Sequence, residues 1–162
     1  MTSVQVPDAD AMRSLGKKIA SLLRAGDVVT LTGPLGAGKT TLTQGIGQGL
    51  GIIGSVTSPT FVVSRLHRNR ESGLALVHVD AYRLQSADEL IDLDLDAIPN
   101  SVVIIEWGAP YVAQITDSWL EVTLRRGSEE EEVDPSAGNR QVSFTGHGLR
   151  WESLDLGVML DA

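Results

Sequence analysis

Apolar and polar positions alternate with a helical period near the start of the chain. Residues 3–6 read as a short strand. From about Asp10 to Arg24, apolar side chains then recur every three or four positions, as on one face of an amphipathic helix. Asp8 precedes this segment as a candidate N-cap, and Gly26 follows it as a stop signal. The pattern predicts a helix that packs one apolar face against the rest of the protein.

Further along the chain, β-branched runs and alternating segments predict strands. The expected strands are residues 27–33, 61–67, 74–84, 101–107, 119–127 and 140–148, and the expected helices are 39–50 and 86–98. Ser86 and Glu89 have the spacing of a capping box at the start of the second of these helices. The last two strands alternate like antiparallel edge strands. Strands that follow one another without a helix, from Phe61 to Leu84 and again after Trp119, predict a mixed sheet with antiparallel edges. The fold class expected is α/β, with a central sheet flanked by helices.

Composition fits a folded soluble protein. The 162 residues are 42% hydrophobic and 21% charged, so we expect one domain over residues 1–162, with a mobile acidic loop at 128–139. No apolar stretch is long enough for a membrane helix. The chain lacks cysteine, which excludes disulfides and thiolate metal sites. The first residues lack the pattern of a secretory signal, so we expect a cytoplasmic protein.

The charge balance bears on possible partners. A formal net charge of −8 argues against wrapping of nucleic acid by the whole protein. Arg65, Arg68 and Arg70 form a local basic cluster. Charge that protects an exposed hairpin edge is the simpler interpretation, and contact with a nucleic acid or an acidic partner is the alternative.

The segment GPLGAGKTT at residues 33–41 carries the strongest chemical signal. It matches G-x-x-x-x-G-K-[ST], and it lies between a predicted strand and a predicted helix. Glycines let the main chain curl around a polyphosphate with its N–H groups inward, and the helix N-terminus favours negative charge. Lys39 is placed to reach the β- and γ-phosphates, and the Thr40 hydroxyl to ligate magnesium. The loop residues expected to bind the nucleotide are Gly33, Leu35, Gly36, Ala37, Gly38, Lys39, Thr40 and Thr41.

Two acidic residues end aliphatic strands, where open α/β sheets place their ligands. Glu106 follows the run VVII, and Asp80 follows LVHV. We expect Glu106 to hold magnesium directly or through water, and Asp80 to position or deprotonate the attacking water or to share the metal. The two roles are interchangeable at this stage. Thr60, in the loop after the helix predicted over residues 39–50, is a candidate for sensing the γ-phosphate and the metal.

In order and spacing, the motifs GPLGAGKTT, TSPTF, HVDAYRL and IEWG resemble the bacterial TsaE (YjeE) family. Its members are small P-loop ATPases needed for the threonylcarbamoyl modification of adenosine in certain tRNAs. The resemblance covers about residues 10–126 and implies that Lys39, Asp80 and Glu106 serve catalysis with ATP and Mg²⁺. It places Thr60 in a switch-like loop and Trp107 near the nucleotide.

The resemblance also implies partner proteins, and some positions of the chain depart from the family pattern. TsaD and TsaB type proteins carry the transferase site, and ATP hydrolysis is thought to reset that assembly. Tyr82 and Arg83 belong to the third motif without an assigned role. Gly108 to Pro110 depart from the family pattern, and no motif is evident after Gly127.

Three other functions are compatible with a phosphate loop. A small-molecule kinase usually needs an arginine-bearing lid, and none is evident in the sequence. A GTPase needs N-K-x-D and D-x-x-G motifs, which are absent. A nucleotide-regulated binding module would bind ATP and have no turnover to lose when Asp80 or Glu106 is replaced.

Overall fold

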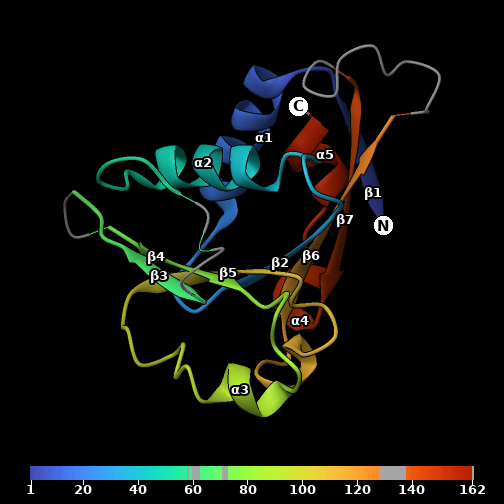
Figure 1. Ribbon diagram of the computed structural model, residues 1–162. Helices are drawn as coiled ribbons and strands as arrows, with labels where there is room; N and C mark the ends of the chain where they lie inside the picture. Colours follow the sequence, from blue (N-terminus) through green and yellow to red (C-terminus); the bar gives the residue numbers. More distant parts are fainter. Residues whose placement is uncertain (58, 60–62, 71–72, 128–137, 162) are drawn as a thin grey trace.

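The structure is a computed structural model that describes residues 1–57, 59, 63–70, 73–127 and 138–161 (Figure 1). Its strands are β1 (Thr2–Val6), β2 (Val28–Thr32), β3 (Ser64–His67), β4 (Ala75–Asp80), β5 (Ser101–Glu106), β6 (Trp119–Arg126) and β7 (Arg140–His147). Its helices are α1 (Ala9–Leu22), α2 (Lys39–Leu50), α3 (Ala87–Ile91), α4 (Leu149–Glu152) and α5 (Leu156–Asp161), with a 3₁₀ turn η1 (Val112–Gln114). These elements confirm the predicted α/β class.

The seven strands form one mixed sheet in the order β1-β7-β6-β2-β5-β4-β3. The central strands β6, β2, β5 and β4 pair in parallel. Antiparallel pairs lie at both ends of the sheet, β1 with β7 and β7 with β6 at one end, and β4 with β3 at the other. The predicted mixed sheet with antiparallel edges is therefore confirmed.

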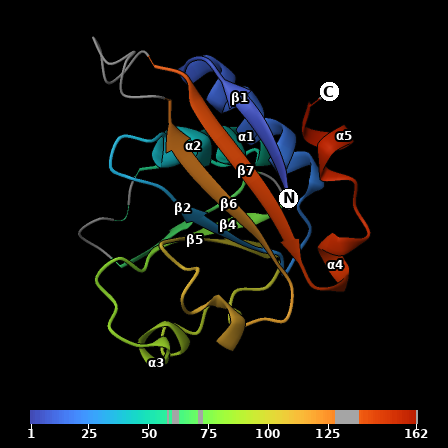
Figure 2. The same cartoon turned by 90° about the vertical axis from the view of Figure 1, so that its right-hand side faces the viewer.

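The prediction that residues 119–127 and 140–148 form the edge strands is wrong. Both β6 and β7 lie inside the sheet, because β1 pairs with β7 from Thr2 opposite Phe144 to Val6 opposite Arg140. The alternation that suggested an edge has another cause. Helices cover only one face of this part of the sheet, and Figure 2 shows no helix in front of the described residues of β1, β7 and β6. A strand covered on one face alternates whether or not it is an edge.

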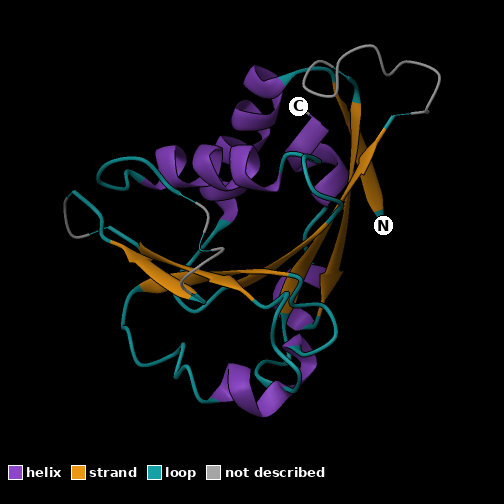
Figure 3. Cartoon of the chain, in the orientation of Figure 1, coloured by secondary structure: helices purple, strands orange, loops and turns teal. Residues whose placement is uncertain are grey.

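Two layers cover the faces of the sheet. In Figure 3, α1 and α2 lie on one side of β2, β5 and β4, and α3 with its connecting loops lies on the other. The larger hydrophobic cluster joins the sheet to α1 and α2, for example through Ile19, Leu42 and Ile104. The smaller cluster joins Val79, Val103 and Leu90 on the opposite face. None of the described helices is both long and apolar enough to cross a membrane.

The first helix matches its prediction closely. It begins after Asp8, whose Oδ1 accepts a hydrogen bond from the Ala11 N–H at 2.8 Å. Its predicted apolar face is buried, including Met12, Leu15 and Ile19. The predicted range of the second helix, 39–50, coincides with α2.

Two predicted elements end earlier in the structure. The strand predicted to reach Leu84 stops at Asp80, whose Oδ1 accepts the Tyr82 N–H at 3.0 Å and turns the chain. The helix predicted over 86–98 begins as expected, since the Glu89 carboxylate accepts the Ser86 N–H at 3.3 Å. It ends at Ile91, and its C-cap is Asp92, an acidic residue at the helix end where the dipole disfavours negative charge.

The C-terminal residues form α4 and α5, two short helices that are not among the elements predicted from the sequence. Trp151 of α4 is 1% exposed, and Leu156 and Leu160 join the same hydrophobic cluster. The Arg150 guanidinium donates to both carboxylate oxygens of buried Asp27, at 3.1 and 2.9 Å. This bidentate pair ties α4 to the segment that leads into β2. Most of the acidic loop predicted at 128–139 lies outside the described residues, as does Thr60.

Glycine lets α1 and α2 approach each other closely. A Cβ atom on Gly45 would lie 2.3 Å from the Arg13 carbonyl oxygen and 2.7 Å from the Arg13 Cα. Backbone atoms cannot move aside as a flexible side chain can. The glycines that lower the helix propensity of α2 thus allow its packing.

We therefore expect Gly45→Ala to lower the free energy of unfolding by about 1–3 kcal/mol, as overpacked sites do. The loss occurs although alanine is the better helix former. Chemical denaturation measures the change, and Gln48→Ala at an exposed position of α2 is the control, with an expected change below about 0.5 kcal/mol. Equal or higher stability of Gly45→Ala would contradict the close-packing argument.

Candidate functional site

The phosphate loop joins the end of β2 to the start of α2, as the motif predicts. Gly38 directly precedes α2 with φ 104°, a backbone conformation that side chains with a Cβ rarely adopt. The first N–H groups of α2 are therefore presented at the loop. Together with the helix dipole, they form a typical anion-binding arrangement.

Lys39 lies across the loop that precedes it. Its Nζ donates to the carbonyl oxygens of Gly33 at 2.5 Å and Pro34 at 3.1 Å, and it lies 5.0 Å from the centre of a Trp107 ring. Burial lowers the pKa of Lys39, while the nearby carboxylates of Glu106 and Asp80 act in the opposite direction. A polyphosphate at the loop would offer this ammonium group stronger partners than two neutral carbonyls.

The two predicted acids end neighbouring parallel strands. Asp80 is directly paired with Glu106 in the register of β4 and β5, so both carboxylates lie at the same edge of the sheet. Glu106 is only 4% exposed, and its Oε2 lies 3.1 Å from Nε2 of the fully buried His78. Asp80 is partly exposed, and one of its oxygens already accepts the Tyr82 N–H. His78 thus holds Glu106, whereas Asp80 is partly accessible to solvent.

Trp107 has an unusual backbone next to these acids. Its φ of 60° is positive, and its N–H donates to the Leu31 carbonyl at 2.7 Å. The Trp107 and Tyr82 rings lie 5.5 Å apart at an angle of 56°. A positive φ in a bulky residue is strained and persists where the surrounding structure imposes it. Here it turns the indole toward Lys39.

These residues surround one cavity of about 920 Å³. The phosphate loop from Pro34 to Thr41, which includes Lys39 and Thr40, forms one part of its lining. The other predicted residues that line it are the strand-end acids Asp80 and Glu106, together with Tyr82, Arg83 and Trp107. The structure thus brings together nearly all of the predicted site. Gly33 accepts a hydrogen bond at its carbonyl oxygen from Lys39, which lines the cavity. The three arginines of the basic cluster lie elsewhere, exposed on and after β3: Arg65, Arg68 and Arg70.

The sequence analysis missed two arginines in this cavity. Arg126 ends β6 and donates to the Leu35 carbonyl at 2.6 Å, and Arg140 begins β7 and donates to the Gly36 carbonyl at 3.4 Å. They are paired with each other in the β6–β7 register. Only strand pairing places them beside the loop, so no local motif could identify them. They stand on the sheet, in contrast to the lid helix expected of a kinase.

The donor set fits a magnesium ion that arrives with a polyphosphate. Thr40, Asp80 and Glu106 offer a hydroxyl and two carboxylates, the hard oxygen donors that Mg²⁺ prefers. Among the described residues, no group of three or more His, Cys, Asp or Glu is arranged to hold a metal alone. Phosphate oxygens and water would therefore complete the coordination shell, as is usual for Mg²⁺ in nucleotide sites.

Comparison with known proteins finds one family and several relatives. The family described as "Threonylcarbamoyl adenosine biosynthesis protein TsaE" matches residues 6–134. A Streptomyces coelicolor protein named "tRNA threonylcarbamoyladenosine biosynthesis protein TsaE" is 50% identical over 152 residues, 91% of this chain and 99% of that protein. A Bacillus subtilis protein of the same name is 34% identical and covers 88% of this chain and 84% of its own length.

A solved structure is similar throughout. The crystal structure of YdiB from Bacillus subtilis has a TM-score of 0.73 and 28% identity, and the match covers 98% of this chain and 93% of that one. With the strand, phosphate loop and helix formed by β2, residues 33–40 and α2, the chain has the P-loop NTPase fold.

Proposed function

The chain belongs to the TsaE family of threonylcarbamoyl adenosine biosynthesis proteins, and from this membership we propose that it binds and slowly hydrolyses ATP within the tRNA modification machinery. Nucleotide turnover would set the state of the complex that transfers the threonylcarbamoyl group. The observation that carries the proposal is the cavity in which Lys39 of a phosphate loop lies beside Asp80 and Glu106.

Each residue has a role that its surroundings support. The N–H groups from Leu35 to Thr41 bind the phosphates, and Lys39 exchanges its carbonyl partners for phosphate oxygens. Thr40 and Glu106 would hold Mg²⁺, which when bound offsets the phosphate charge. His78 keeps the Glu106 carboxylate in place through the 3.1 Å contact. Asp80, with one oxygen still available, orients the attacking water or accepts its proton.

Arg126 and Arg140 support a slow reaction that a partner accelerates. Both side chains donate to carbonyl oxygens of the loop that would bind the phosphates, so their charges lie close to the expected phosphate position. An arginine that moves onto the transferred phosphoryl group can raise a phosphoryl-transfer rate by several orders of magnitude. The partners that the family resemblance implies are TsaD and TsaB type proteins.

The experiment compares phosphate release and complex formation with and without these partners. We expect the isolated chain to release phosphate slowly and at least about tenfold faster with TsaD and TsaB, since partner-completed sites gain that much or more. In pull-downs, ATP should change the amount of partner recovered with the wild type and not with Lys39→Ala. Two results together would contradict a coupled ATPase: phosphate release by the isolated chain as fast as in the complex, and partner recovery that does not depend on the nucleotide.

Phosphoryl transfer to a small molecule is the second candidate function, because Arg126 and Arg140 line the phosphate-loop cavity, although from the sheet and not from a lid helix. The same assay separates the two. An ATPase releases phosphate to water in the absence of any metabolite, whereas a kinase depends on an added acceptor.

A further inference from the structure

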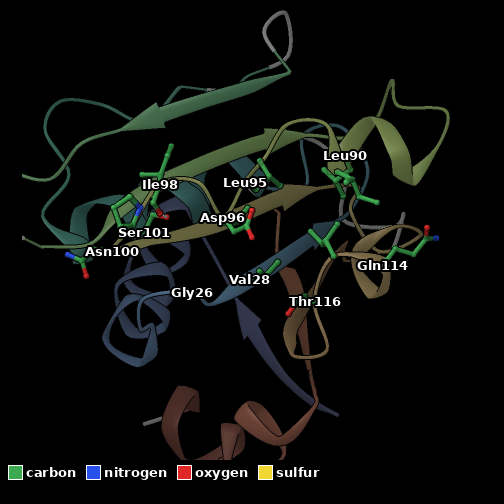
Figure 4. A pocket seen from close by; sticks show the side chains of 14 residues that line it. Gly26, Val28, Leu90, Leu95, Asp96, Ile98, Asn100, Ser101, Gln114 and Thr116 are labelled. Atoms are coloured by element: carbon green, nitrogen blue, oxygen red, sulfur yellow. Dashed lines mark hydrogen bonds between the residues drawn. The ribbon is translucent and has the colours of Figure 1, made fainter.

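A second cavity, of about 470 Å³, lies on the face of the sheet opposite the phosphate loop. Figure 4 shows it between the first residues of β2 and β5 and the segment that follows α3. Within the described parts of the chain, the two cavities share no lining residue. The two cavities thus lie toward opposite ends of β2 and β5.

The cavity exists because the cover on this face is thin. On the opposite face α1 and α2 have 14 and 12 residues, whereas α3 has five and is followed by turns up to Asn100. Such a segment cannot fill the space over the sheet as a full helix would. Its exposed Ile91, with 49% of its surface accessible, lies at the edge of the same cavity.

The walls favour an aliphatic occupant. Its apolar lining residues include Val28 and Val103 from β2 and β5, Leu90 and Leu95 from the covering segment, and Ile115 after η1. Among the residues that the structure describes, no lysine, arginine or histidine lines the cavity. A phosphorylated ligand or a nucleic acid would therefore find no cation there.

The part of the chain that covers the cavity is rich in acidic residues. From Leu84 to Leu124 the sequence contains eight acidic residues and no Lys, Arg or His, which accounts for the whole formal net charge of −8. Five of these carboxylates are exposed on the segment that covers the cavity, and Asp96 lines the cavity itself. The five are Asp88, Glu89, Asp92, Asp94 and Asp96.

We propose that this acidic pocket, defined as the cavity and these five carboxylates, docks a segment of another protein in which aliphatic residues are flanked by lysine or arginine. The aliphatic side chains would enter the cavity, and the cations would face the carboxylates around it. Complementary charge of this kind selects the partner and speeds its association, while the buried apolar contacts hold it. Because the phosphate-loop cavity is separate, partner and nucleotide can bind together. The proposal does not depend on ATP hydrolysis.

The test uses NMR on the full chain with labelled methyl groups. The probe is a blocked ten-residue peptide in which Leu and Ile alternate with Lys and Arg. One control peptide has Ser in place of Leu and Ile, and a second has Gln in place of Lys and Arg. We expect saturable shifts of the Val28, Val103 and Leu90 methyl groups with the probe, and at least tenfold weaker binding of both controls.

A charge variant tests the carboxylates. Asp96→Lys should weaken binding of the probe at least tenfold, whereas Asp10→Lys, the same change on an exposed residue of α1, should alter it less than twofold. Methyl spectra of free Asp96→Lys and free Asp10→Lys are compared with that of the wild type. Matching spectra away from the substituted residue show that both variants are folded. Saturating ATP should leave the affinity for the probe within twofold.

Several outcomes would overturn the proposal. Among them are no methyl shifts at the limit of peptide solubility, equal binding of the serine control, or shifts confined to the phosphate-loop cavity. Shifts of the same methyl groups with increasing concentration of the chain alone would replace the partner by a second copy of the chain.

Discussion

Lys39→Ala is expected to weaken ATP binding by about a hundredfold, which corresponds to roughly 2.7 kcal/mol. The Lys39 ammonium group is half-buried, and burial lowers its pKa, so it gains strongly from a phosphate partner. Alanine removes the cation and leaves the N–H groups of the loop, which explains a residual affinity. Calorimetry with Mg²⁺ and ATP measures the loss.

Lys17→Ala is the matched control, because Lys17 is an exposed lysine of α1 and its loss changes the net charge equally. We expect it to bind ATP within twofold of the wild type. Circular dichroism and thermal unfolding verify that Lys39→Ala is folded after the loss of its contacts to Gly33 and Pro34. Undiminished ATP affinity in folded Lys39→Ala would remove the basis for nucleotide binding at this loop.

Glu106→Gln is expected to lower the turnover number by roughly 10²–10³-fold and to leave ATP binding within a few fold. The amide has the shape of the carboxylate but no charge for Mg²⁺ or for a proton. Glu106 is 4% exposed and held by His78, so the substituted side chain should keep its position. Phosphate release in the presence of the partners gives the turnover number, and calorimetry gives the affinity.

Glu121→Gln provides a control with the same chemistry away from the site. Glu121 Oε2 lies 2.9 Å from His147 Nε2, and the two residues form a second Glu–His pair that is partly exposed on β6 and β7. Its loss should leave turnover within twofold. If Glu106→Gln had the turnover of the wild type, Asp80 would carry both acidic roles. If the wild type with its partners bound ATP but released no phosphate, there would be no turnover for either substitution to lower, and a binding module without hydrolysis would replace the ATPase.

Local features of the sequence predicted the individual elements well. The cap at Asp8, the β-branched run of β2 and the glycine-rich turn at Gly38 involve contacts within a few residues, so their structure follows from neighbours in the chain. The shorter α3 is instructive in the same way. Its apolar pattern continued to residue 98, but the aspartates along it oppose a longer helix.

Predictions that depended on distant partners were less complete. The alternation in β6 and β7 shows that one face is buried, and it carries no information on which strand lies beside them. The N-terminal strand takes the outer position. Likewise the apolar residues of α4 and α5 became interpretable only against the sheet on which they pack.

The sequence by itself determined the phosphate loop, because a polyphosphate cradle is built from consecutive main-chain N–H groups and one adjacent lysine. It also identified the two acids as strand ends. The tertiary structure alone decided that Asp80 and Glu106 are neighbours, that His78 holds Glu106, and that Arg126 and Arg140 reach the same cavity. It alone revealed the acidic pocket. These juxtapositions depend on strand order and register, which are set by packing over the whole sheet and leave no signature at any single position.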